Sequence, residues 1–191
     1  MRAYPEPTGF HAPAARAAVA APVAPTVLFA VPATDREQYS GNQFTRLFAH
    51  TSADALRVLT QHAPRLVVAD WDEQQVEAGE LCRAAKNLPT TSVLVTMSEV
   101  ANAPHAIKAG AHAILLKPFF PSLLAGRIGR TLRETATIRG FRQPGPNRAW
   151  PQIACPMCSA GGAVSFDFSS HRRMWLACLA CDNTWLGARL E

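Results

Sequence analysis

The sequence predicts an α/β fold, a doubly wound five-stranded parallel sheet, followed by a small β unit held by zinc. Strand-like and helix-like segments alternate about five times between residues 26 and 136, a pattern that predicts a parallel sheet covered by helices on both faces. The stretch Leu66 to Ala69 is apolar at every position, as buried strands of parallel sheets are. Four of the five cysteines form two Cys-x2-Cys pairs near the C-terminus, a spacing typical of metal sites.

Short apolar runs predict the strands, and amphipathic stretches with capping residues predict the helices between them. We expect strands at residues 26–31, 44–51, 65–70, 91–98 and 112–119. Helices are expected at residues 52–62, 76–87, 103–109 and 121–135. Ser52 is the predicted cap of the first helix, because its hydroxyl can accept from backbone amides of the first turn.

Composition divides the 191 residues into four parts. Residues 1–25 are rich in alanine and proline and predict a flexible arm, and residues 137–153 are rich in proline and glycine and predict a linker. The α/β domain then spans residues 26–136 and the small β unit residues 154–191. No apolar run approaches the roughly 18 residues of a membrane span. The start of the chain lacks the pattern of a secretory signal, so we expect a cytoplasmic protein without a membrane partner.

The formal net charge of +5 lies mainly in the C-terminal part. Residues 137–191 carry six arginines against three acids. Four cysteines bound to zinc as thiolates would add about −2 to this part of the chain. The basic balance is therefore weak evidence for a nucleic-acid partner.

Asp70 is the first candidate functional residue. It follows the apolar strand directly, and ligands and chemistry gather beyond the carboxyl ends of parallel strands. The alternative is structural, with Asp70 merely capping the next helix.

Residues 26 to about 134 resemble the receiver domain of bacterial two-component response regulators, a flavodoxin-like fold. The matching residues, in chain order, are Asp70-Trp71, Gly79, Thr96, Ala109-Gly110-Ala111 and Lys117-Pro118-Phe119. The resemblance implies that Asp70 accepts a phosphoryl group, that the Thr96 hydroxyl contacts it and that the Lys117 amine pairs with it. A lysine and a hydroxyl beside a phosphorylated carboxylate are also what the charge of the phosphoryl oxygens requires. A plain ion pair between Lys117 and Asp70 is the alternative.

Two departures from that pattern indicate a degenerate receiver. Receiver domains carry two acids after the first strand that help to hold Mg²⁺, and those positions fall here on Val31 and Pro32. We therefore expect Mg²⁺ binding and phosphoryl transfer to be badly impaired. Asp35, a few residues on, is expected to cap a short helix. The aromatic switch residue of the family corresponds to Ile114, which has no polar group.

The C-terminal cysteines resemble those of a zinc ribbon. Cys155 and Cys158 form one pair, Cys178 and Cys181 the other, and 19 residues lie between the pairs. Two such turns can present four sulfurs tetrahedrally to a structural Zn²⁺, with no open position for catalysis. We expect three short strands around this site. Cys82, the fifth cysteine, is expected to be a small core residue.

Two surfaces are candidates for contacts with a partner. In the zinc unit, Arg172, Arg173, Trp175 and Trp185 could contact a protein or a nucleic acid, or the two tryptophans could form the small core of the unit. On the last helix of the α/β domain, three arginines at residues 127, 130 and 133 form a stripe. We interpret the stripe as solvated, with a dimer or partner face as the alternative.

These observations lead to a signalling hypothesis. We expect a non-enzymatic protein in which a degenerate receiver acts as a phosphorylation-independent interaction module, coupled to a zinc-ribbon docking or effector unit. Its partner would be a protein, such as a histidine kinase or a cytoskeletal or regulatory protein, and a homodimer is compatible with the sequence. The alternatives are a working phosphoacceptor, Asp70, in a phosphorelay and a nucleic-acid-binding regulator that acts through the zinc ribbon.

Overall fold

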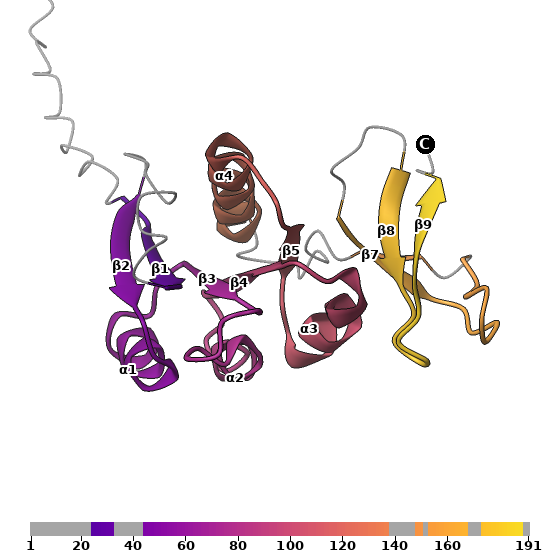
Figure 1. The fold of residues 1–191 in the computed structure, drawn as a ribbon. Coiled ribbons are helices and arrows are strands. Elements are labelled where there is room, and N and C mark those ends of the chain that lie inside the picture. Colours follow the sequence, from indigo (N-terminus) through magenta and orange to yellow (C-terminus); the bar gives the residue numbers. More distant parts are fainter. Residues whose placement is uncertain (1–23, 33–43, 138–147, 151–152, 168–172, 189–191) are drawn as a thin grey trace, which may run out of the picture.

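The computed structural model describes residues 24–32, 44–137, 148–150, 153–167 and 173–188, which form two sheets (Figure 1). The predicted arm lies almost wholly outside the described residues, as do Asp35 and Arg172. Within the described ranges, no helix is long and apolar enough to cross a membrane.

The first sheet, here called the parallel sheet, has the strand order β2-β1-β3-β4-β5. Its strands are β1 (Thr26–Ala30), β2 (Thr45–Ala49), β3 (Leu66–Asp70), β4 (Ser92–Met97) and β5 (Ala113–Leu116), and every pairing is parallel. The predicted doubly wound, five-stranded fold is therefore confirmed. Each strand is shorter than predicted, by one to four residues.

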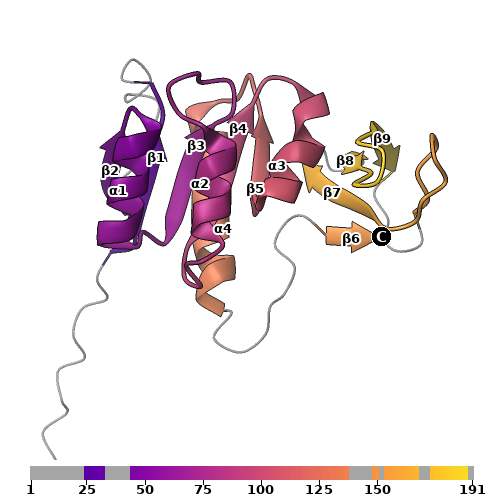
Figure 2. The same ribbon diagram turned by 90° about the horizontal axis from the view of Figure 1, so that it is seen from below.

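Helices cover both faces of the parallel sheet. On one face lie α1 (Ser52–His62), α2 (Ala78–Ala85) and α3 (Ala103–Ala109), which follows a short 3-10 turn, η2 (Val100–Asn102); α4 (Pro121–Thr137) lies on the other (Figures 1 and 2). All residues of β3 and β4 are buried, so the continuous apolar pattern of β3 does mark a strand that is covered on both sides. Two core clusters result, one beneath each helical layer.

The cap of α1 differs from the prediction by one residue. Thr51, with extended backbone, is the N-cap, and its hydroxyl accepts from the Asp54 amide at 3.2 Å. The Ser52 hydroxyl instead accepts from the Glu77 amide at 2.7 Å, and the Ser52 amide donates to the Gln75 carbonyl. Ser52 therefore ties the start of α1 to the loop that precedes α2.

The arginine stripe on α4 is only partly solvated. Arg130 and Arg133 are exposed as expected, but Arg127 is 8% exposed, beside the buried Leu124 and Ile128. The prediction failed at this position because a 3-residue spacing drifts around a helix, which brings the first arginine toward the sheet.

The second sheet, here called the C-terminal sheet, is antiparallel in the order β6-β7-β8-β9. Its strands are β6 (Arg148–Trp150), β7 (Ala163–Asp167), β8 (Arg173–Ala177) and β9 (Thr184–Ala188). Three of these strands match the prediction. The fourth, β6, lies inside the range predicted as a linker and pairs with β7.

The C-terminal sheet packs against the free edge of the parallel sheet. Its strand β8 alternates between two cores: Met174 and Leu176 belong to the small core of the C-terminal sheet, whereas Trp175 and Ala177 pack into the core beneath α1, α2 and α3. Strand β7 contacts β5, and the C-terminal sheet lies beside α3 (Figure 2). The Lys108 ammonium on α3 pairs with Asp182. The two sheets therefore share buried surface.

Two threonines on α1 test the cap. We expect Thr51→Ala to lower the free energy of unfolding by about 1 kcal/mol, because the Asp54 amide loses its acceptor. Thr60→Ala is the matched control. The exposed Thr60 hydroxyl only bonds back to the Leu56 carbonyl within the helix, and alanine is the better helix former, so stability should stay the same or rise slightly. Urea unfolding of both variants measures the difference, and equal effects would contradict the assignment of the cap.

Candidate functional site

The carboxyl edge of the parallel sheet gathers polar side chains from three adjacent strands. Asp70 ends β3, Thr96 lies beside it in β4, and Lys117 directly follows β5. The structure thus brings together the three residues that the sequence singled out.

Asp70 is buried, with 3% of its surface exposed, and is neutralised by Lys117. The Lys117 ammonium donates to both carboxylate oxygens of Asp70, at 2.7 and 2.6 Å. The Asp72 amide donates to one of the same oxygens at 3.1 Å, so Asp70 does not cap α2. A buried carboxylate needs such a counter-ion, because an unpaired charge in a core is strongly destabilising.

Asp72 and Ser98 extend this network. Asp72 accepts from the Lys117 ammonium at 3.1 Å and from both the amide and the hydroxyl of Ser98, at 2.9 and 2.7 Å. The sequence analysis missed Ser98; its place directly after a buried strand, next to the strand that delivers the acids, was the available signal.

The charges of this network shift two pKa values. Burial opposes the charge of Lys117, but hydrogen bonds and charge from Asp70 and Asp72 outweigh it and hold the pKa of the lysine above its ordinary value. Partial burial likewise acts to raise the pKa of Asp72, but the bonds from Ser98 and Lys117 outweigh it and keep that pKa below its ordinary value. Both groups are therefore charged at neutral pH.

Thr96 carries a polar atom that the network does not use. Its side chain is fully buried, and its hydroxyl oxygen has no hydrogen-bond partner within the part of the chain that the structure describes. Thr96 is the register partner of Asp70, and parallel partners point to the same face of a sheet.

The positions of the expected magnesium acids are apolar. Val31 is fully buried after β1, and its carbonyl accepts from the His50 ring at 2.9 Å. Among the described residues, Asp70 and Asp72 are the carboxylates of this network, and both already accept from Lys117. This donor set does not fit Mg²⁺, which needs several oxygen ligands in octahedral geometry.

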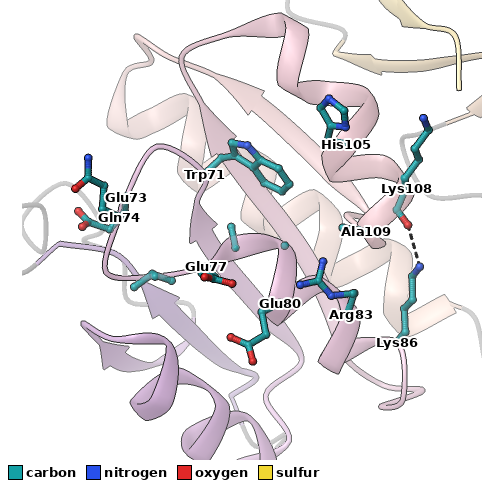
Figure 3. Close-up of a pocket in the computed structure, with 13 residues that line it drawn as sticks. Trp71, Glu73, Gln74, Glu77, Glu80, Arg83, Lys86, His105, Lys108 and Ala109 are labelled. Carbon is teal, nitrogen blue, oxygen red and sulfur yellow. Dashed lines mark hydrogen bonds between the residues drawn. The ribbon is translucent and has the colours of Figure 1, made fainter. Parts of the chain in front are cut away.

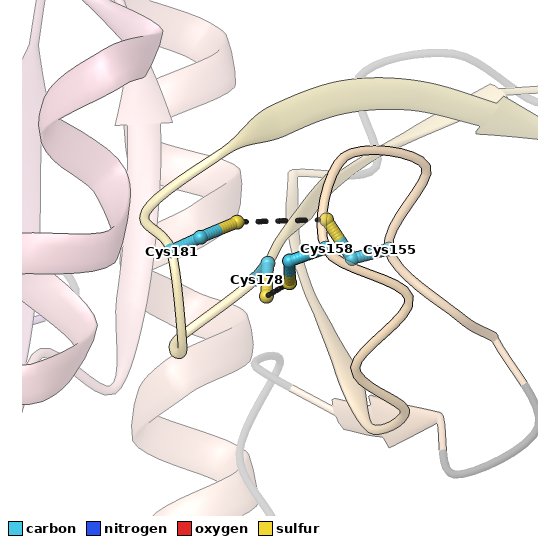
Figure 4. A group of neighbouring side chains, drawn as sticks. All are labelled: Cys155, Cys158, Cys178 and Cys181. Carbon is cyan, nitrogen blue, oxygen red and sulfur yellow. Dashed lines mark hydrogen bonds between the residues drawn. The ribbon is translucent and has the colours of Figure 1, made fainter.

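A second candidate site lies in the C-terminal sheet. The sulfur atoms of Cys155, Cys158, Cys178 and Cys181 all lie within 4.8 Å of one another (Figure 4). The Cys155 and Cys181 sulfurs are 3.7 Å apart, as are those of Cys158 and Cys178. Zn–S bonds of about 2.3 Å in a tetrahedron place sulfurs about 3.8 Å apart, so the cluster fits a four-cysteine metal site.

The surroundings of the cluster agree with bound thiolates. The Met157 amide and the Asn183 side chain donate to the Cys155 sulfur, at 3.4 and 3.8 Å. Cys82 lies apart from this cluster, in α2, where burial raises the pKa of its thiol to about 12. Its predicted place in the core is confirmed.

Two residues of the predicted contact surface, Trp175 and Trp185, pack against different cores. Trp175 packs into the larger core beneath α1, α2 and α3, and Trp185 packs against the small core of the C-terminal sheet. Arg173 begins β8.

Solved structures share the fold of the parallel-sheet domain. A signal receiver domain from Vibrio parahaemolyticus is 18% identical to this chain with a TM-score of 0.54, over 62% of this chain and all of that domain. The receiver domain of a Francisella response regulator is 21% identical with a TM-score of 0.51, over 58% of this chain and 98% of that one. NtrX from Brucella abortus is 21% identical with a TM-score of 0.55, over 69% of this chain and 32% of that one.

No protein-family model matches the chain, and no curated protein resembles it significantly. At these identities the likeness concerns the fold alone. The parallel-sheet domain has the fold of response-regulator receiver domains.

The Asp72 network predicts a pH dependence. A carboxyl whose pKa is lowered by folding stabilises the native state above its unfolded pKa, near 3.8, and this contribution is lost as the pH falls through the lower folded value. Asp72→Asn and Ser98→Ala should both reduce the loss of stability between about pH 5 and pH 2. Ser122→Ala, an exposed serine on α4, is the control and should leave the profile unchanged. Urea unfolding across this pH range measures the stability of each protein. Identical pH profiles for wild type and the three variants would contradict the network.

Proposed function

We propose that the chain is a signal-transduction protein whose receiver-fold domain acts as a phosphorylation-independent protein-interaction module. The observation that carries this proposal is the state of Asp70. Both of its oxygens accept from Lys117, one also accepts from the Asp72 amide, and an apolar residue, Val31, stands where the metal-binding acids would be. The anion serves as the partner of a structural ion pair.

Exposed apolar side chains support a protein partner. Phe120, directly before α4, and Leu123, in its first turn, are 78% and 44% exposed. Met157 and Leu179, at the tips of the two cysteine loops, are exposed as well. Phenylalanine and methionine are enriched in the surfaces through which proteins bind one another.

The C-terminal sheet is proposed to be a zinc ribbon that acts as a docking or effector unit. The four-sulfur cluster supports zinc as the metal, because thiolates in a tetrahedron suit Zn²⁺. The ion would be structural, since four cysteines leave no position for a substrate. A nucleic-acid role for this unit is less well supported, because the partly buried Trp175 packs against the larger core.

A working phosphoacceptor is the second candidate. The buried, unpartnered Thr96 hydroxyl beside Asp70 favours it, because a phosphoryl group on Asp70 could accept from that hydroxyl.

Phosphodonor treatment separates the two candidates. Incubation with acetyl phosphate and Mg²⁺ should leave the intact mass of the protein unchanged, because Asp70 and Asp72 already accept from Lys117 and the apolar Val31 stands where a metal-holding acid would be. Beryllofluoride with Mg²⁺ should leave the amide NMR signals of Thr96 and Lys117 in place. Asp70→Asn is the control for the site. A mass increase or a shift that wild type shows and Asp70→Asn lacks would overturn the proposal in favour of the phosphoacceptor.

Metal analysis tests the zinc ribbon. We expect about one Zn²⁺ per chain, lost in Cys158→Ser and retained in Cys82→Ala, which alters a buried cysteine outside the cluster. Because β8 contributes to the larger core, removal of zinc should also lower the unfolding temperature of the parallel-sheet domain. Elemental analysis and calorimetry measure both effects. A metal-free protein of unchanged stability would contradict the ribbon assignment.

A further inference from the structure

A pocket of about 700 Å³ lies between the loop after β3, helix α2 and helix α3 (Figure 3). Neither Asp70 nor Lys117 lines the pocket, so it is distinct from their ion pair. Trp71, the residue after Asp70, is one of the lining residues. Its volume falls within the range of small-molecule sites, about 300–1,000 Å³.

The charged side chains of this pocket are divided between two sides. The acids lie on the side of the loop after β3 and the start of α2, and the cations lie toward α3; the acids are Glu73, Glu77 and Glu80, and the cations are Arg83, Lys86 and Lys108, of which Lys108 pairs with Asp182 (Figure 3). Within the described ranges, Arg83 has no ion-pair partner, and Lys86 donates to a neutral group, the Lys108 carbonyl, at 3.0 Å. Two cationic groups therefore face the pocket without a protein carboxylate to neutralise them.

Because Gly79 has no side chain, a small space remains that both the Trp71 ring and the Arg83 guanidinium border. A Cβ atom at Gly79 would lie 3.4 Å from a terminal nitrogen of Arg83 and 3.6 Å from the Trp71 ring. Any longer side chain at this position would extend between ring and guanidinium. A ligand that lies over Gly79 can thus contact an aromatic surface and a bidentate hydrogen-bond donor together.

We propose that this pocket binds a nucleotide, with the base against Trp71 and the phosphate on Arg83 and Lys86. Stacking on an aromatic ring suits a planar base, and guanidinium and ammonium groups suit phosphate oxygens. The carboxylates of Glu77 and Glu80 can accept from ribose hydroxyls or from an exocyclic amine. Free phosphate would make no contact with the Trp71 ring. An acidic peptide would be repelled by the carboxylates of Glu77 and Glu80. The proposal is independent of the signalling function proposed above, because it needs neither phosphorylation of Asp70 nor a protein partner.

Calorimetric titration of the full-length, zinc-loaded protein with AMP, GMP and ATP tests this site, with adenosine and inorganic phosphate as fragments. At least one nucleotide should bind, and both fragments should bind at least about tenfold more weakly, because each uses only half of the pocket. Failure of all three nucleotides to bind at millimolar concentration, or equal affinity for free phosphate, would overturn the proposal.

Two variants act on the site by different means. Arg83→Glu reverses the cation, and Gly79→Val fills the space while all charges remain, so each should weaken binding by at least about tenfold. Arg57→Glu, which alters an exposed arginine on α1 outside the pocket, is the control and should bind as wild type does. Thermal unfolding confirms that each variant is folded. An unchanged affinity in both folded pocket variants, or an equal loss in the control, would refute the assignment.

Discussion

The ion pair between Lys117 and Asp70 is the interaction on which the carboxyl edge of the sheet depends. Asp70 is almost fully buried at the end of a central strand, and the cost of that burial is offset by two short bonds from one ammonium group. The same ammonium bonds to Asp72, which in turn holds Ser98 after β4. One cation thus joins the ends of three strands. In this arrangement both oxygens of the carboxylate that ends β3 accept from a cation of the same domain.

The sequence allowed the parallel-sheet domain to be predicted because its signals are local and repeated. Fully buried strands read as continuous apolar runs, and Asp70 follows one of them, whereas Thr96 and Lys117 were expected beside it from the resemblance to receiver domains. The four cysteines were predictable for a similar reason, since two Cys-x2-Cys pairs are a spacing typical of metal sites. These features depend on spacing along the chain more than on distant contacts.

The features that the sequence did not predict depend on distant partners. Strand β6 is only three residues long, and it forms because β7 offers a pairing edge. The alternation in β8 indicates that Trp175 faces away from Met174 and Leu176, but it does not tell which core lies on that side. Arg127 was misjudged because its burial is decided by how α4 lies on the sheet.

Strand β8 also determines how independently the two parts of the chain can evolve. Because successive residues of one short strand belong to two different cores, a change on either side is restricted by packing. Transfer of this C-terminal unit to another receiver fold would leave the Trp175 ring without its surroundings, and loss of the unit would uncover the edge of β5 for pairing with other chains. The C-terminal sheet is therefore a part of this protein that recombination could not exchange as a ready-made module.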